Sequence, residues 1–439
     1  MPDHAVSSDP AVQVQLDRLR VLSPGADILG LGRITALLAR VGNPQERLPP
    51  VLHVAGTNGK GSTCAFLRTA LEAAGYRAHV YSSPHLVRFN ERIRLAGELI
   101  DDAALAPLLA EVLDAGGDIG ASFFEVTTAA AFLAFARIPA DACIIEVGLG
   151  GRLDATNVIA RPLITGIAQL GIDHQSFLGD KIEAIAAEKA GIAKPGVPLV
   201  TMRYPATVAA ITAKVAHDRG ALLADEEVRW RWSAGDDALI YEDGNGAIKT
   251  PLPALAGAHQ AANLALAIAM LRHQRRLIIP AMAYRTAASS ARWPARMQRL
   301  GNGALTRRVA HASVWLDGAH NAAAAEAIAA SLATLGSNRS NEGWSLIVGM
   351  LANKDAAGLL SPIAACIDRL IAVPIPGHEH HSPGQIAAIA RSLGVVADTA
   401  PDVAAGLDML AGPVPRNILI LGSLYLAGHV LAANGELPV

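Results

Sequence analysis

The sequence predicts an α/β protein of two domains, each built on a mostly parallel β-sheet that helices cover on both faces. Short apolar runs alternate along the chain with longer, alanine-rich segments of helical periodicity, and this alternation is typical of parallel sheets. The chain has 439 residues, which is too many for one core of ordinary size. The two observations together indicate two cores in succession.

The first domain is predicted to span residues 1–298. Its buried strands are expected from the apolar runs at 51–55, 78–82, 142–147, 163–167 and 198–201. The segments between them, such as 62–74 and 181–192, have the residue spacing of helices. A polar, aromatic stretch at 228–249 contains Asp-Gly and Asn-Gly pairs, which favour tight hairpin turns, so we expect a small antiparallel addition there.

The second, smaller domain is predicted to span residues 299–439. After Trp293-Pro294 the alternation begins again, with strands expected at 313–316, 345–348, 369–373 and 417–421. Alanine-rich helical segments lie between these runs. The run His378-Glu379-His380-His381 follows one of these strands, and we interpret it as a loop rather than as a metal site.

Composition and charge exclude several classes of protein. The formal net charge is −2 with no long run of one sign, whereas a general nucleic-acid binder needs a basic face. The three cysteines are sparse and lack metal-ligand spacing, which is typical of a reduced, cytoplasmic protein. The N-terminus does not resemble a signal peptide, and no apolar stretch has the length of a membrane helix, so we expect no membrane association.

A glycine-rich turn follows the first predicted strand and leads into a helix. It reads Gly56-Thr57-Asn58-Gly59-Lys60-Gly61-Ser62-Thr63. Such a turn aims backbone N–H groups and the helix N-terminus at an anion, and its lysine and hydroxyl suit the β/γ-phosphates and Mg²⁺. The spacing departs from the usual G-x-x-x-x-G-K-[ST], because Gly61 separates Lys60 from Ser62. A plain glycine turn with an exposed lysine would not explain the whole cluster, so we predict nucleotide binding by residues 57–62.

Three polar side chains come at or after the ends of predicted strands. Glu146 ends one strand, where ligands bind in an open parallel sheet, and its carboxylate suits Mg²⁺. Ser83 follows another strand, and His174 follows a third, where a neutral imidazole could ligate a second divalent ion. The alternatives are an acid that caps a strand end, a common Ser-Pro turn and a structural histidine. Lys189, in a predicted helix, reads on its own as a salt-bridge partner.

The motifs of the chain resemble those of folylpolyglutamate synthases in the Mur ligase superfamily, in family order and over nearly the whole length. The matching segments are V-A-G-T-N-G-K-G-S, S-S-P-H-L, E-V-G-L-G-G-R-L-D-A-T-N, E-K-A-G-I, H-Q-A-A-N, W-P-A-R, L-D-G-A-H-N, G-M-L-A-N-K-D and L-G-S-L-Y. The resemblance implies that the first domain is of the P-loop type and that the second is a Rossmann-like ligase domain.

The resemblance also implies roles for individual residues. The catalytic set corresponds to Lys60, Glu146, His174 and Lys189, the last carrying a CO₂-derived carbamate. The ligands of two Mg²⁺ ions correspond to Ser62, Ser83, Glu146, His174 and the Lys189 carbamate. ATP contacts correspond to Thr57, Asn58, Gly59, Lys60, Gly61, Ser62, Asn263, Arg296, Asp317 and, less closely, His320. The pterin-binding wall corresponds to Ser122, Phe123, Phe124, Glu125, Leu153, Asp154 and Ala155, and more loosely to Asp27, Ile28 and Leu29.

The activity implied by the resemblance is an ATP-dependent amide ligation in folate metabolism. L-glutamate would be added to 7,8-dihydropteroate, and to the γ-carboxylate of tetrahydrofolate, through an acyl phosphate. The expected partners are these small molecules, and the chain is expected to be a cytoplasmic monomer. The alternatives are a folylpolyglutamate synthase with one activity, a Mur-type ligase that acts on a UDP-muramyl peptide, and a P-loop ATPase switch or transporter subunit without an acyl acceptor.

Overall fold

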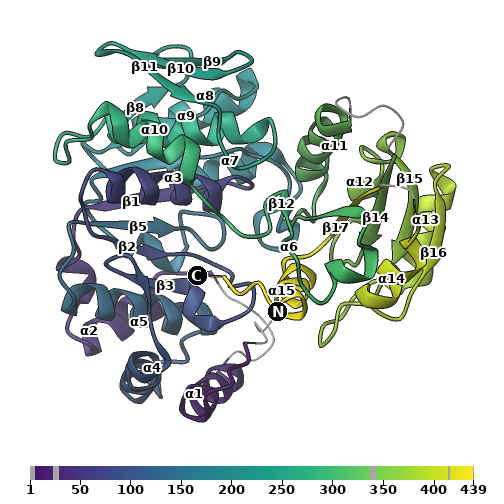
Figure 1. The fold of residues 1–439 in the computed structure, drawn as a ribbon. Coiled ribbons are helices and arrows are strands. Elements are labelled where there is room, and N and C mark those ends of the chain that lie inside the picture. The colour runs from purple at the N-terminus through teal and green to yellow at the C-terminus, as the bar shows by residue number, and fades with distance from the viewer. Residues whose placement is uncertain (1–4, 23–28, 337–342, 414–415, 439) are drawn as a thin grey trace. The chain divides into compact units, whose positions relative to one another are not determined.

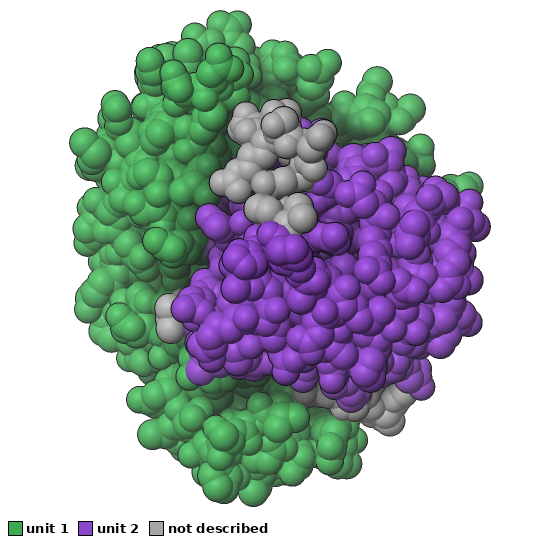
Figure 2. All heavy atoms as spheres, turned by 45° about the vertical axis from the view of Figure 1, so that its right-hand side comes forward, with its two compact units in different colours: residues 1–254, 261–292 green, residues 255–260, 293–439 purple. Residues whose placement is uncertain are grey.

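The computed structural model describes residues 5–22, 29–336, 343–413 and 416–438 (Figure 1). The chain forms two compact units, coloured separately in Figure 2. Unit 1 comprises residues 1–254 and 261–292, and unit 2 comprises residues 255–260 and 293–439. The predicted boundary between residues 298 and 299 falls inside unit 2. Strand β12 (Gln298–Arg299) pairs with strand β13 (Ala312–Leu316), and this pairing joins the segment before the boundary to the unit 2 sheet.

Unit 1 is built on an eight-stranded sheet in the order β4-β3-β2-β5-β1-β6-β7-β8. The strands are β1 (Val51–Ala55), β2 (Ala78–Tyr81), β3 (Ile93–Leu95), β4 (Glu98–Leu99), β5 (Ala142–Glu146), β6 (Ile164–Ile167), β7 (Pro198–Thr201) and β8 (Leu222–Asp225). All run in the same direction except β3, which pairs antiparallel with both β2 and β4. The predicted mostly parallel sheet is confirmed. The edge strands β4 and β8, and β3 next to β4, were not predicted, because they are short and only partly buried.

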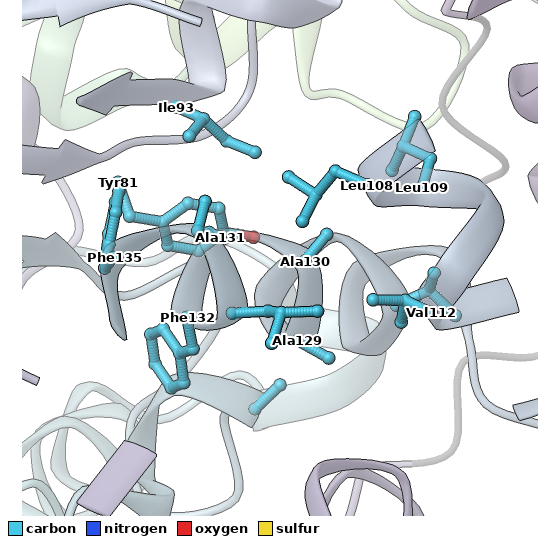
Figure 3. Close-up of a cluster of buried hydrophobic side chains, with 14 of the residues drawn as sticks. Tyr81, Ile93, Leu108, Leu109, Val112, Ala129, Ala130, Ala131, Phe132 and Phe135 are labelled. Atoms are coloured by element: carbon cyan, nitrogen blue, oxygen red, sulfur yellow. The ribbon is translucent and has the colours of Figure 1, made fainter. Parts of the chain in front are cut away.

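Helices cover both faces of this sheet (Figure 1). The helices of unit 1 are α1 (Pro10–Val21), α2 (Gly32–Arg40), α3 (Lys60–Ala73), α4 (Asp102–Gly116), α5 (Phe123–Arg137), α6 (Gln175–Leu178), α7 (Ile182–Ala190), α8 (Ala206–Asp218), most of α9 (His259–Arg272), and α10 (Ala281–Ser290). Helices α1, α2, α4 and α5 share one core with the sheet, in which Tyr81, Phe132 and Phe135 pack with leucines of α4 (Figure 3). Helices α3 and α10 pack against each other, and α3 also packs on β1, β2 and β5.

A three-stranded antiparallel sheet completes unit 1, as the sequence predicts. It consists of β9 (Trp230–Ala234), β10 (Ala238–Asp243) and β11 (Gly246–Pro251). The hairpin between β10 and β11 turns at residues 244 and 245, so that Asp243 pairs with Gly246. Gly246 has φ +102°, a conformation that glycine adopts without steric cost. The Asp-Gly and Asn-Gly pairs of the sequence therefore mark the turn correctly.

Unit 2 is a second α/β unit on a six-stranded sheet in the order β12-β13-β17-β14-β15-β16. Its further strands are β14 (Trp344–Val348), β15 (Ile367–Ala372), β16 (Val396–Thr399) and β17 (Arg416–Leu421), all parallel to β13, and only β12 is antiparallel. Its helices are α11 (Ala322–Gly336), α12 (Ala356–Leu360), α13 (Pro383–Ser392), α14 (Val403–Leu410) and α15 (Leu424–Asn434). Within the described residues, no helix has the length and apolar character needed to cross a bilayer.

Candidate active site

The candidate site of unit 1 lies at the carboxyl ends of three adjacent strands. Strand β1 lies between β5 and β6 in the sheet, and all three run in the same direction. The phosphate loop follows β1, a glycine-rich loop at 147–154 follows β5, and residues 168–174 follow β6. Because parallel strands end at one edge, the fold brings these three loops together, which is where ligands bind in open α/β sheets.

The phosphate loop is anchored to the loop that follows β6. The backbone N–H groups of Thr57 and Asn58 both donate to the carbonyl of Gln169, at 2.8 and 3.1 Å. The hydroxyl of Thr57 donates to the carbonyl of Gly171 at 2.9 Å and accepts from the Gly171 N–H at 3.1 Å. These four bonds fix the loop ahead of α3, which begins at Lys60. Thr57 and Asn58 thus hold the loop in shape through backbone and hydroxyl contacts.

Two lysines converge on one carbonyl of the phosphate loop. Lys60 Nζ donates to the carbonyl of Gly56 at 3.1 Å and to that of Thr57 at 3.3 Å. Lys189 Nζ, from the end of α7, donates to the same Gly56 carbonyl at 3.0 Å. Lys189 is only 4% exposed, and burial, helped by the charge of Lys60, lowers its pKa to about 7. A substantial fraction of Lys189 is therefore the neutral amine near pH 7.

Glu146 lies beside the first turns of α3. It ends β5 and is 5% exposed. Burial raises the pKa of the Cys64 thiol in α3; the negative charge of Glu146 raises it further, and the charge of Lys60 lowers it. Both charged groups therefore act at short range on the same part of α3. Ser62, in the first turn of α3, is buried. Glu146 pairs with Val54 of β1, the strand that leads into the phosphate loop, and a carboxylate oxygen near such a loop fits a hard cation such as Mg²⁺.

The other two predicted metal ligands are more accessible. Ser83 follows β2 and is half-buried. His174 is exposed, has φ +53° and precedes α6. The carboxylate of the neighbouring Asp173 raises the pKa of Lys189, so this loop lies close to the lysine. Among the described residues no three His, Cys, Asp or Glu side chains cluster as a metal site. The predicted ligand set contains only two such side chains, so its assignment stays a prediction.

The glycine-rich loop after β5 packs directly on the helix that carries Lys189. A Cβ atom on Gly151 would lie 2.7 Å from the carbonyl oxygen of Glu188 and 2.9 Å from Cα of Lys189. The N–H of Arg152 donates to the same Glu188 carbonyl at 2.8 Å. Only glycine allows this approach of backbone to backbone. The G-L-G-G-R segment at 148–152 and the E-K-A-G-I segment at 188–192 therefore pack against each other, and this contact positions Lys189.

Asn263 lies against the phosphate loop, while its predicted contact with a nucleotide stays a prediction. It lies on α9 and is 3% exposed. A Cβ atom on Gly59, whose φ is +83°, would lie 2.4 Å from Asn263 Oδ1. The amide side chain thus rests directly on the turn that starts α3. Gly61, the inserted glycine of the motif, is buried in the first turn of that helix.

The remaining predicted nucleotide contacts gather in unit 2, around the end of β13. The carboxylate of Asp317 accepts from the N–H of Met297 at 2.7 Å and from that of Ala319 at 2.7 Å. His320 Nδ1 bonds to the carbonyl of Gly318 at 2.8 Å. A Cβ atom on Gly318 would lie 2.7 Å from Nη1 of Arg296. The structure therefore brings Arg296, Asp317 and His320 together, while their contact with a nucleotide stays a prediction.

The predicted pterin wall begins at the N-terminus of α5. Ser122 caps this helix, and the Glu125 carboxylate accepts from the Ser122 N–H at 2.7 Å. Arg33 Nε donates to the same carboxylate at 2.9 Å. The Phe124 ring covers Gly148, where a Cβ atom would lie 2.3 Å from the ring. Ser122 and Glu125 thus shape the helix start, whereas Phe124 lies against the loop that follows Glu146.

The rest of the predicted pterin wall differs in exposure. Phe123 is 7% exposed, and the guanidinium of Arg92 lies 5.4 Å from the centre of its ring. Asp154 and Ala155 are buried, and Leu153 is half-buried. Leu29 is half-buried, while Asp27 and Ile28 lie outside the described residues.

Comparison with known proteins identifies the family. A family model described as the C-terminal domain of dihydrofolate synthetase matches residues 305–433. The chain is 35% identical over 410 residues to the dihydrofolate synthase/folylpolyglutamate synthase of Escherichia coli K12, a match that covers 92% of this chain and 90% of that protein. The chain belongs to the dihydrofolate synthase/folylpolyglutamate synthase family. The predicted membership is confirmed.

Solved structures of this family agree in fold. The Escherichia coli enzyme in complex with DHPP and ADP superposes with a TM-score of 0.86 at 33% identity, covering 97% of both chains. A bifunctional folylpolyglutamate synthase/dihydrofolate synthase with Mn, AMPPNP and L-glutamate bound gives a TM-score of 0.82 at 32% identity, covering 99% of both chains. The folylpolyglutamate synthase of Lacticaseibacillus casei is 34% identical, over 91% of this chain and 92% of that protein.

Two buried polar contacts of unit 1 carried little signal in the sequence. His53 is a polar residue within an apolar strand, and its Nε2 lies 2.8 Å from the Thr156 hydroxyl. Arg92 is 2% exposed, and its Nε donates to His85 Nδ1 at 2.9 Å. A histidine inside a buried run is the visible signal for the first contact. Arg92 lies among polar residues with Arg88 and Arg94, a pattern that fits a solvated face or contact with an anionic substrate equally well. The run at 378–381 is a loop of unit 2 in which His381 bonds to the carbonyl of Lys354, as predicted for a loop.

Gly59→Ala is expected to weaken nucleotide binding. The new methyl group must displace the Asn263 side chain, and the backbone of the alanine must keep φ +83°. We therefore expect ADP affinity to fall at least about ten-fold. Gly42→Ala is the matched control, because Gly42 has φ +84° and open space around it. Both variants should lose about 1–2 kcal/mol of stability from the left-handed backbone. Titration calorimetry with ADP checks this, and equal affinities for the two variants would contradict it.

Proposed function

We propose that the chain is an ATP-dependent ligase that joins L-glutamate to 7,8-dihydropteroate, forming dihydrofolate, and to the γ-carboxylate of tetrahydrofolate. The observation that carries the proposal is the convergence of Lys60, Lys189 and Glu146 at the phosphate loop of a chain in this family. A P-loop switch needs the phosphate loop but has no use for the predicted pterin wall at 122–125, which lies against the loop after Glu146. The same wall favours a folate over a UDP-muramyl peptide.

The reaction needs the carboxylate to be activated. A carboxylate oxygen attacks the γ-phosphorus of ATP, the bond to the β,γ-bridging oxygen breaks, and an acyl phosphate and ADP form. The amine of glutamate then attacks the acyl carbon, phosphate leaves with the carboxylate oxygen, and the amine loses a proton. Lys60 is placed to offset the negative charge of the meeting carboxylate and phosphoryl group.

Divalent metal fits this centre. Glu146, Ser62 and Ser83 offer oxygen atoms, which Mg²⁺ prefers, and His174 offers a ring nitrogen. When bound, such ions neutralise charge on the phosphoryl oxygens. Related structures that hold Mn with AMPPNP support metal and nucleotide use. We propose Asn263, Arg296, Asp317 and His320 as further nucleotide contacts, and we expect a cytoplasmic monomer.

Lys189 is suited to carry a carbamate. Its burial lowers its pKa to about 7, whereas the pKa of an ordinary lysine is about 10.4. The neutral amine attacks CO₂, a C–N bond forms, and one proton is released, so the neutral side chain becomes an anion. That anion would offer oxygen atoms to a metal ion, and it would replace the repulsion between Lys189 and Lys60 at the Gly56 carbonyl with an attraction.

Lys60→Ala and Glu146→Ala are expected to abolish ligation and leave the fold intact. Each removes a charge that acts on the phosphoryl group, an effect worth on the order of 3 kcal/mol or a rate loss of at least about 100-fold. Products are weighed by mass spectrometry with dihydropteroate and with tetrahydrofolate in parallel. Lys214→Ala, which removes an exposed lysine, is the control. A near-wild-type rate in either active-site variant would contradict the proposed ligase function.

The same assay on the wild-type chain separates the alternatives. Glutamylation of both substrates supports the proposed dual activity, and glutamylation of tetrahydrofolate alone indicates a folylpolyglutamate synthase with one activity. Release of phosphate from ATP alone at the full rate favours a switch. Turnover only with a UDP-muramyl peptide would assign the chain to the other branch.

The carbamate is tested with ¹³C-labelled bicarbonate. We expect a carbamate carbon signal in the wild type that is absent from Lys189→Met and present in Lys214→Met. Because the reaction uses the neutral amine, the signal should weaken as the pH falls through about 7. Removal of CO₂ should lower the ligation rate, and bicarbonate should restore it. A fully active enzyme without CO₂ and without the labelled signal would contradict the carbamate.

A further inference from the structure

A short 3₁₀ turn at Ala155–Val158 ties together the three segments that carry the reactive groups. We call the four residues Asp154, Ala155, Thr156 and Asn157 the 154–157 clamp. All four are buried, with exposed fractions of 5% or less. Three of them extend a polar side chain, and each of these side chains reaches a different segment of unit 1.

Asp154 holds the loop that follows Glu146. Its carboxylate accepts from the N–H of Leu149 at 2.8 Å and from the N–H of Gly148. It also accepts from the N–H of Thr156 at 3.0 Å and from the Thr156 hydroxyl at 2.5 Å. Burial raises the pKa of this carboxyl, while the hydrogen bonds oppose that rise. Four donors from unit 1 fill the acceptor positions of this carboxylate, so the Asp154 side chain holds the loop in shape.

Thr156 links Asp154 to the strand that leads into the phosphate loop. Its single hydroxyl proton goes to Asp154, so the hydroxyl must accept from His53 Nε2, 2.8 Å away. His53 is fully buried in β1, and its Nδ1 has no hydrogen-bond partner within the described part of the chain. Burial lowers the pKa of His53 to about 3, so the ring is neutral and carries its proton on Nε2. The donor and the acceptor of both hydrogen bonds, from His53 to Thr156 and from Thr156 to Asp154, are therefore fixed.

Asn157 reaches the helix that carries Lys189. Its Nδ2 donates to the carbonyl of Arg152 at 3.0 Å and to that of Gly191 at 3.2 Å. Gly191 directly follows α7, at the end of which Lys189 lies. The backbone carbonyl of Asn157 in turn accepts from Lys194 Nζ at 2.9 Å. The third arm of the clamp thus fixes the loop and the helix end against each other.

We propose that Thr156, acting with His53 and Asn157, is a positioning residue that sets the relative geometry of the phosphate loop, Glu146 and Lys189. The inference rests on the proposed function, because it assigns the clamp to that reaction. None of the three side chains is expected to touch substrate. A misplacement of about 1 Å at reacting groups costs on the order of 100-fold in rate, so the clamp acts on turnover more than on substrate affinity.

The test compares Thr156→Val with Thr156→Ser. Valine has the shape of threonine but no hydroxyl, and serine keeps the hydroxyl. For Thr156→Val we expect kcat to fall at least about ten-fold with little change in the KM for ATP, and for Thr156→Ser we expect a rate within about three-fold of wild type. Hydrogen exchange in the free protein should show the amides of Gly148 and Leu149 exchanging faster in Thr156→Val, with recovery in Thr156→Ser.

Thr212→Val is the matched control for loss of a buried threonine hydroxyl. Its hydroxyl donates only within its own helix, to the carbonyl of Val208 at 2.9 Å. Thermal unfolding of both valine variants separates general destabilisation from mispositioning. If Thr156→Val does not fold, Asp154→Asn replaces it, because the amide keeps the shape and loses acceptor positions. The same fall in kcat and faster exchange of the Gly148 and Leu149 amides are then expected.

Three outcomes would overturn the proposal. They are an unchanged kcat in Thr156→Val, an equal loss in Thr156→Ser, and unchanged exchange at Gly148 and Leu149. Wild-type ligation is measured first. If the wild type forms no product, the proposed function fails, and with it the assignment of the clamp to that reaction, while the exchange measurement still reports whether the clamp holds the loop.

Discussion

Two ammonium groups donate to a single backbone carbonyl in unit 1, that of Gly56. Lys60 reaches it from the first turn of α3 and Lys189 reaches it from the end of α7. Burial raises the cost of charging Lys189, and repulsion from Lys60 adds to that cost. The two effects together lower the pKa of Lys189. A centre of this kind is suited to anions, and ATP and a carboxylate substrate supply them.

This arrangement depends on close approaches that only particular residues allow. Gly151 lets the loop after Glu146 touch the backbone at Glu188 and Lys189, and Gly59 leaves room for Asn263 on the phosphate loop. Side chains at these positions would collide with the facing atoms, so the segments would have to shift. The 154–157 clamp acts in the opposite sense, because its hydrogen bonds pull the same segments together. The glycines therefore allow the segments to approach closely, and the 154–157 clamp holds them in that arrangement.

Much of the fold could be predicted from periodicity alone. The buried parallel strands β1, β2, β5, β6 and β7 are continuous apolar runs, and such runs leave a plain signal. Strands β3, β4 and β8 are short and half-exposed, so their residues carry no clear period. The phosphate loop was predictable for a local reason, since its strand, glycines and helix are consecutive in sequence.

The rest of the site is not local. Lys189 is separated from the phosphate loop by more than a hundred residues, and its environment exists only after the sheet and α7 have assembled. Asp154 looks in sequence like a substrate contact, while the structure shows its carboxylate bonded to Gly148, Leu149 and Thr156. Such roles follow from hydrogen-bond partners, which residue types and spacing do not specify.

The central claim is that this centre activates a carboxylate by phosphorylation. The most direct measurement supplies dihydropteroate labelled with ¹⁸O in its carboxylate, together with ATP and L-glutamate, and weighs the phosphate released. The account predicts that each phosphate formed with product carries one labelled oxygen, because the oxygen that attacks phosphorus leaves with it. Amide formation with unlabelled phosphate would contradict the acyl-phosphate route.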